Sequence, residues 1–154
     1  MSYTIRLLSP KESVPPAGEI TASLKGEGFD ATVAGAPDGE GWEMIEVRLP
    51  AAEPIQVSRF LREGEENPVD EEIDGFVDEL AEREETPALE QVMDALRKAR
   101  QMLVVDVPES FAWGEERTAA DALVEFLADS TEALIQADGE GFYDRMGDLL
   151  AALE

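Results

Sequence analysis

Carboxylates are the reactive side chains that this sequence offers in number. Its 154 residues include 36 Asp and Glu and 12 Lys and Arg, with no histidine and no cysteine. Without imidazole or thiol groups, the chain cannot use a histidine base, a cysteine nucleophile or a Cys/His zinc site. The sequence also lacks a nucleophile elbow, a P-loop and a dinucleotide-binding fingerprint. We therefore name no catalytic residue, expect no cofactor, and predict that the protein is not an enzyme.

Two arrangements of carboxylates could still do chemistry. Glu43 and Glu46 lie close together on an expected strand and could act as general acid and base, but among so many acids such pairs arise without a function. Asp138, Glu140 and Asp144 could offer oxygen ligands to Ca²⁺ or Mg²⁺. Their spacing does not follow the EF-hand loop, whose twelfth position is a leucine here. We therefore favour a structural turn over a metal site.

The formal net charge of −24 excludes some classes of partner. Nucleic acids and anionic membranes are bound by clustered Lys and Arg, and this chain would repel both. No apolar run approaches the ~20 residues of a membrane span, and residues 1–10 do not resemble a signal peptide. We expect a cytoplasmic protein without membrane contacts. A salt-adapted or GC-rich genome is an alternative source of the acids.

A third of the acids lie in one segment. The 23 residues from Glu63 to Glu85 hold 12 acids and a single base, Arg83. Apolar residues recur there at positions 69, 73, 76, 77 and 80, which predicts an amphipathic helix with an acidic outer face, begun by Asn67 and Pro68. Such a face suits a basic protein partner, and solvation alone is the alternative. The expected contacts are Glu71, Glu72, Asp74, Asp78, Glu79 and Glu82.

Two further features involve residues outside that segment. Phe111 and Trp113, between Pro108 and Gly114, could be exposed contact residues or a lid over the core. Asp106 ends the most apolar expected strand, and it could pair with Arg6 or simply face solvent. The sequence leaves both choices open.

The elements that position these residues follow from apolar periodicity. Strands are expected over 3–8, 29–34, 42–49, 54–61, 101–108 and 133–137, with another beginning at 142. Helices are expected from Pro16 to Gly26, over 68–80, from Thr86 to about residue 100, and from Thr118, where Asp121 three residues later completes a capping box. Met146, Leu149, Leu150 and Leu153 suggest a short terminal helix.

A turn sequence occurs twice, 100 residues apart. Asp38-Gly39-Glu40-Gly41 precedes Trp42, and Asp138-Gly139-Glu140-Gly141 precedes Phe142. Each follows an expected strand, helix and strand, so duplication and coincidence both stay open. We predict a single α+β domain, residues 1–154, in which two pseudo-repeated β-α-β-hairpin units of ferredoxin-like character, 1–62 and 102–154, are joined by a helical segment, 63–101, that contains the central acidic helical pair.

The segment from Ala119 to Tyr143 resembles the tail of uncharacterised bacterial proteins, in which a helix leads to a strand and an acidic, glycine-rich turn. This resemblance implies a bacterial origin and no particular activity. The alternation of strands and helices also resembles ferredoxin-like folds, including small-molecule-sensing ACT domains.

We therefore expect a non-catalytic acidic protein that binds a basic protein partner, for example as an immunity-type inhibitor. A small-molecule-binding regulatory domain of ferredoxin-like or ACT-like type is the first alternative, and a carboxylate-based or metal-dependent enzyme is the second. The oligomeric state stays open.

Overall fold

The protein is described by a computed structural model that covers residues 2–35, 42–50, 53–111 and 114–152. Over these residues the fold is α+β, as predicted, with one antiparallel sheet of eight strands in the order β2-β3-β4-β5-β1-β6-β7-β8. The strands are β1 (Ser2–Ser9), β2 (Thr32–Ala34), β3 (Met44–Arg48), β4 (Ile55–Leu61), β5 (Gln101–Pro108), β6 (Leu134–Ala137), β7 (Gly141–Tyr143) and β8 (Leu149–Ala152). The helices are α1 (Ala17–Gly26), α2 (Pro68–Leu80), α3 (Pro87–Lys98) and α4 (Glu115–Thr131), with a 3₁₀ turn, η1 (Glu109–Phe111).

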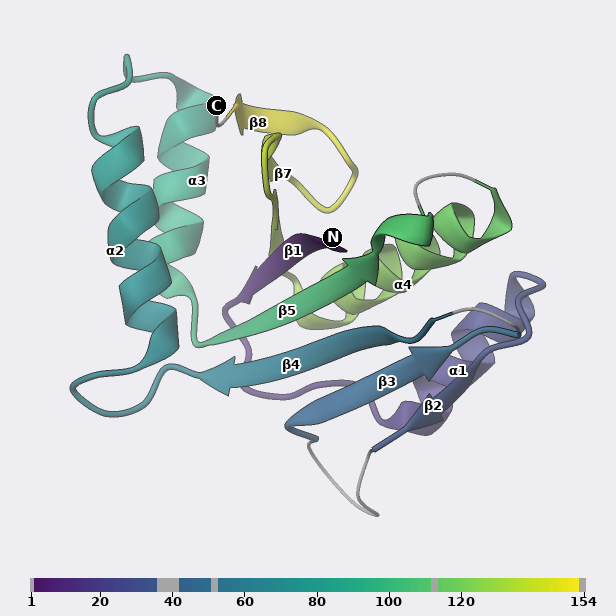
Figure 1. Ribbon diagram of the computed structural model, residues 1–154. Coiled ribbons are helices and arrows are strands. Elements are labelled where there is room, and N and C mark those ends of the chain that lie inside the picture. The colour runs from purple at the N-terminus through teal and green to yellow at the C-terminus, as the bar shows by residue number, and fades with distance from the viewer. Residues whose placement is uncertain (1, 36–41, 51–52, 112–113, 153–154) are drawn as a thin grey trace.

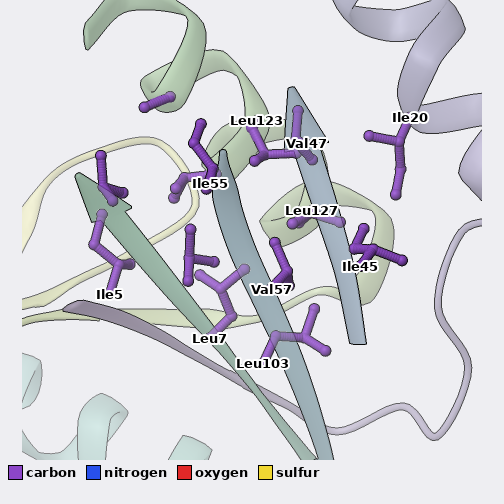
Figure 2. Close-up of a cluster of buried hydrophobic side chains, with 14 of the residues drawn as sticks. Ile5, Leu7, Ile20, Ile45, Val47, Ile55, Val57, Leu103, Leu123 and Leu127 are labelled. Carbon is purple, nitrogen blue, oxygen red and sulfur yellow. The ribbon is translucent and has the colours of Figure 1, made fainter. Parts of the chain in front are cut away.

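The two faces of the sheet carry different helices (Figure 1). Alternate residues of a strand point to opposite faces, so Ile5 and Leu7 of β1 enter one core and Leu8 enters the other. The first core lies beneath α1 and α4, and Figure 2 shows Leu123 and Leu127 of α4 gathered with aliphatic side chains of the strands. Helices α1 and α4 therefore cover this face of the sheet over most of its strands.

The second core covers only part of the opposite face. There α2 and α3 stand as a pair at one end of the strands (Figure 1). They pack on Leu8, Met102, Leu134 and Phe142, and the ring of Phe142 meets that of Phe76 edge-on at 5.1 Å. The remainder of this face, over β3, the first parts of β4 and β1 and the last part of β5, is not covered by a helix among the described residues.

Local capping explains where α2 and α3 begin. The Asn67 side chain accepts a hydrogen bond from the backbone N–H of Asp70 at 2.9 Å, and Thr86 does the same for Leu89 at 3.0 Å. Each cap is followed by a proline, whose missing N–H costs nothing in the first turn. The predicted starts of both helices are confirmed.

The predicted start of one helix and the predicted terminal helix are wrong. Helix α4 begins at Glu115, so Thr118 lies inside the first turn, where its hydroxyl donates to the Gly114 carbonyl instead of capping. The residues expected to form a terminal helix instead form β8, which pairs with β7. The Asp144 carboxylate accepts hydrogen bonds from the backbone N–H groups of Met146 and Asp148, which turns the chain back toward the sheet edge.

The structure does not confirm that the two predicted units are repeats. Three strands separate β1 from β2, whereas only β1 separates β5 from β6. The second Asp-Gly-Glu-Gly turn joins β6 to β7 as predicted, and the first, residues 38–41, lies outside the described residues. No helix in the described part of the chain is long and apolar enough to cross a membrane.

Candidate functional site

The predicted acidic face of α2 lies on the surface of the molecule. Val69, Ile73, Phe76 and Leu80 point into the second core, so the intervening positions face outward. We call the exposed carboxylates of this helix and the turn after it the acidic surface, which comprises Glu71, Asp74, Asp78, Glu79 and Glu82.

Few of the carboxylates in the segment 63–85 are paired with a cation within the molecule. Of the 12 acids between residues 63 and 85, all of which the structure describes, only Asp70 and Glu72 lie within 4.0 Å of a cationic group. The one base of the segment, Arg83, makes no ion pair at this distance among the described residues. The acidic surface therefore presents its negative charge to solvent.

Arg62 holds the start of α2 in place. Its Nε donates to Asp70 Oδ1 at 2.5 Å, and its Nη1 donates to the carbonyl oxygens of Arg97 and Ala99 at the end of α3. The hydrogen bond from Arg62, joined by one from the Asn67 amide, holds the pKa of the Asp70 carboxyl below its usual range. Asp70 thus serves the fold, whereas the acids of the acidic surface do not.

Glu72, a predicted partner contact, instead joins α2 to the sheet. Its carboxylate lies 3.5 Å from Arg6 Nε, while Arg6 Nη1 donates to Asp138 Oδ1 at 2.5 Å and to Gln136 Oε1 at 3.0 Å. The Arg6 side chain is only 19% exposed. Glu72 is therefore half-buried and committed to an internal contact.

The suggested pairing of Asp106 with Arg6 is wrong. In the antiparallel register of β1 and β5, Arg6 stands opposite Val104, and Asp106 stands opposite Thr4. The Thr4 hydroxyl donates to Asp106 Oδ1 at 2.9 Å. No cationic group of the described residues lies within 4.0 Å of this half-buried carboxylate.

The uncovered part of the sheet forms a second surface, which sequence reasoning missed. Two rows of cross-strand neighbours line it, and we call these six residues the open face: Met44, Ser58 and Val104 in one row, and Gln56, Asp106 and Thr4 in the other. Val104 is half-buried and also packs against the second core, so it marks the border of this surface. Met44 is 52% exposed, although it is apolar. The alternation of Met44 with the buried Ile45 and Val47 was the signal that could have revealed this surface.

A shallow hollow lies at each end of the open face. One, of about 670 Å³, includes Glu53, Gln56 and Asp106 in its lining, and no Lys or Arg lines it among the described residues. The other, of about 620 Å³, runs from Met44 and Ser58 to the start of α2. Carboxylates therefore border the open face at both ends.

A third hollow, of about 500 Å³, lies between the end of α2 and the start of α3. Its apolar lining comes from Leu80, Leu89 and Met93, and its charged lining comes from two arginines and three acids, which are Arg83, Arg97, Glu85, Glu90 and Asp94. Asp94 lies 3.8 Å from Arg97 and 2.8 Å from Lys98, and the hydrogen bond from Lys98 lowers the pKa of the Asp94 carboxyl.

The two aromatic residues predicted as contacts have different outcomes. Phe111 is 1% exposed and belongs to the first core, so it is a core residue and not a contact residue. Trp113 lies outside the described residues.

The three metal-ligand candidates have structural contacts. Asp138 binds Arg6, Glu140 accepts a hydrogen bond from the Tyr143 hydroxyl at 2.9 Å, and Asp144 organises the turn before β8. The described residues contain no group of three or more acids placed to hold a metal ion. Glu46, one of the possible acid and base pair, lies 2.7 Å from Arg48 Nη2.

Comparison with known proteins adds no family to this description, because no family model, no curated protein and no solved structure matches the chain.

Proposed function

We propose that this protein acts by binding a basic protein partner through the acidic surface, without catalysis. One observation carries the proposal: the carboxylates of the acidic surface are exposed and lie beyond 4.0 Å of any described cation, on a helix whose other side is buried in the second core. Their mutual repulsion costs stability, and a basic partner would relieve it. An immunity-type inhibitor of a cationic protein would gain fast association from such a field.

We further propose that the protein acts in the cytoplasm of a bacterium. Net charge −24 argues against nucleic acid as the ligand, and the resemblance of residues 119–143 supports a bacterial source. The absence of cysteine agrees with the reducing cytoplasm.

We also infer ferredoxin-like character for the centre of the sheet. In the order β4-β5-β1-β6, the first and third of these four strands along the chain are central, and α1 and α4 pack on the same core. On this inference β2, β3, α2 and α3 are additions to the central unit, and the acidic surface belongs to one of the additions.

The test is capture from bacterial cytosol on the immobilised protein at low and at high ionic strength. Captured basic proteins should be lost as salt rises past ~0.15 M, because dissolved ions screen the electrostatic attraction between the acidic surface and a basic protein. A double variant, Asp78→Asn with Glu79→Gln, should lower the affinity and its salt dependence. The matched control, Glu125→Gln with Asp129→Asn on the exposed side of α4, changes the net charge equally and should change neither. An affinity that is the same at both ionic strengths would refute the proposal.

The hollow between α2 and α3 supports a second candidate, a small-molecule-binding regulatory domain. Leu80, Leu89 and Met93 would suit a ligand with an apolar body, and Arg83, which makes no ion pair within 4.0 Å among the described residues, would suit an anionic group on that ligand. The hollow lies at the helical pair. A thermal-shift screen of aromatic and aliphatic carboxylates tests it: stabilisation should be absent from an Arg83→Gln, Arg97→Gln variant.

A further inference from the structure

We infer that the open face is the part of the interface that selects the partner, and that it takes a segment bearing an Arg or Lys side chain next to an apolar one. This inference rests on the proposed function and adds to it the site and chemistry of the docking segment. The evidence comes from the sheet register, the exposed fractions of the side chains and the carboxylates at the ends of the face.

The first observation is the Asp106 carboxylate, which lies on the open face of the sheet without a cationic partner among the described residues. Asp106 lies in β5 with one strand on each side, and its only hydrogen-bond donor among the described side chains is the Thr4 hydroxyl. A carboxylate can accept several hydrogen bonds, so Asp106 keeps acceptor capacity toward solvent. An incoming guanidinium or ammonium group would use this capacity.

The second observation is a row of neighbours beside that carboxylate, which we call the apolar row because Val104 and Met44 stand on either side of Ser58 in it. Val104 lies on the same face of β5 two residues before Asp106, which places it about 7 Å away along the strand. Ser58 and then Met44 continue the row across β4 and β3, and Met44 is 52% exposed. A thioether side chain on a surface adapts readily to an apolar group of a partner.

The third observation is the sign of the charge around the face. The hollow at the Asp106 end also contains Glu53 in its lining, and the hollow at the Met44 end contains Glu63 and Glu66. The arginine in that second lining, Arg59, is directed elsewhere, because its Nε donates to the Gln101 side chain and its Nη2 to the Glu12 carbonyl. Arg6 and Arg48 also lie on this side of the sheet, but each is already paired with a carboxylate, Arg6 with Asp138 and Arg48 with Glu46. The remaining carboxylates therefore favour a cationic segment over a second copy of this chain, which carries the same negative charge.

The position of the open face links it to the acidic surface. Glu72 of α2 contacts Arg6, and Arg6 stands opposite Val104 in the register. Helix α2 therefore stands beside the apolar row. A basic partner drawn in by the acidic surface would meet the open face next.

The experiment uses the intact protein and two synthetic probes of equal charge, an oligoarginine peptide and a peptide in which arginine alternates with leucine. Binding is measured by fluorescence anisotropy, and the contact residues are located from amide chemical shifts in NMR spectra. We expect the alternating peptide to bind more tightly and to shift the amides of β4 and β5 at Ser58, Val104 and Asp106.

Two variants probe the two halves of the site. Asp106→Asn keeps an acceptor for the Thr4 hydroxyl and removes the charge, and it should weaken binding of the alternating peptide about two- to fivefold, the range of an exposed ion pair. Met44→Ser should reduce the preference for the alternating peptide over oligoarginine. The control, Glu125→Gln on the far face, should leave both affinities unchanged, and thermal melts verify that each variant is folded.

The outcomes separate this inference from the proposed function. If shifts are confined to α2 and only α2 variants weaken binding, the acidic surface acts alone and the role of the open face is refuted. If neither probe binds at low salt, or if Glu125→Gln weakens binding as much as Asp106→Asn does, both proposals fail. If the protein self-associates through β3, β4 and β5, as judged by sedimentation and the same amide shifts, the occupant is a second copy and the inference is refuted.

Discussion

Replacement of Gly141 by alanine tests how β7 and β8 are joined. Gly141 opens β7 at φ 145°, opposite Ala152 in the register. A Cβ added there would lie 2.1 Å from the Ala151 carbonyl oxygen and 2.8 Å from Ala152 Cα, both of them backbone atoms that no side-chain rotation can move. The hairpin would therefore have to open or shift.

The same turn contains a matched control. Gly139 also has a positive φ, 79°, but a Cβ there would meet nothing within 4 Å. Gly139→Ala should cost the conformational term alone, about 1–2 kcal/mol. Gly141→Ala should carry a similar conformational cost and, in addition, the cost of the steric clash, which is about 1–3 kcal/mol for overpacking. We expect the second variant to lose about 2–5 kcal/mol of the free energy of unfolding.

Urea unfolding followed by circular dichroism measures both costs. Hydrogen exchange of the β8 amides shows whether Gly141→Ala releases that strand, in which case their protection falls while that of β5 is kept. Equal losses for Gly139→Ala and Gly141→Ala, with β8 protection intact, would show that the close approach of β7 to β8 is not as described and would refute this reasoning.

Three further predictions concern α2 and the second core. Phe142→Ala should cost about 3–5 kcal/mol in urea unfolding, because the ring is fully buried against Phe76; a loss below 1 kcal/mol would mean that the site collapses freely. Asn67→Ala should cost about 0.5–2 kcal/mol through loss of the cap of α2, and Asn67→Asp, which keeps an acceptor, should restore part of it in the same assay. The lowered pKa of Asp70 stabilises the fold fully above the unfolded value of about 3.9 and ceases to do so as pH falls through the lower folded value. Unfolding measured across that range should therefore show a smaller loss of stability on acidification in Asp70→Asn than in the parent protein, and identical slopes would contradict the Arg62–Asp70 contact.

Much of the secondary structure could be predicted from the sequence because it is set by neighbours along the chain. The cap of α2 and its apolar stripe lie within one short segment, and the alternation in β1, β3 and β4 follows directly from the residue order. The C-terminal residues were misassigned because Leu149 and Leu150 fit both a short helix and a strand. Hydrogen bonding to the free edge of β7 decided between them.

The candidate site divides in the same way. The acidic surface could be predicted, since charge and helical period are properties of the segment itself. The open face could not, because it exists where helices fail to cover the sheet, and that depends on which strands become neighbours. The same long-range register brings Arg6 into contact with Asp138 and Glu72, and it places Asp106 beside Thr4.

The sequence by itself determined the identity of most elements, the excess of negative charge and its concentration on one helix, because periodicity, capping and charge act over a few residues. Only the tertiary structure decided the strand order, the burial of Phe111 and the juxtaposition of the acidic helix with an uncovered sheet face. These depend on contacts between residues more than 130 positions apart in the chain, as in the pair of Arg6 and Asp138, which are 132 positions apart, and no local pattern encodes such a pairing.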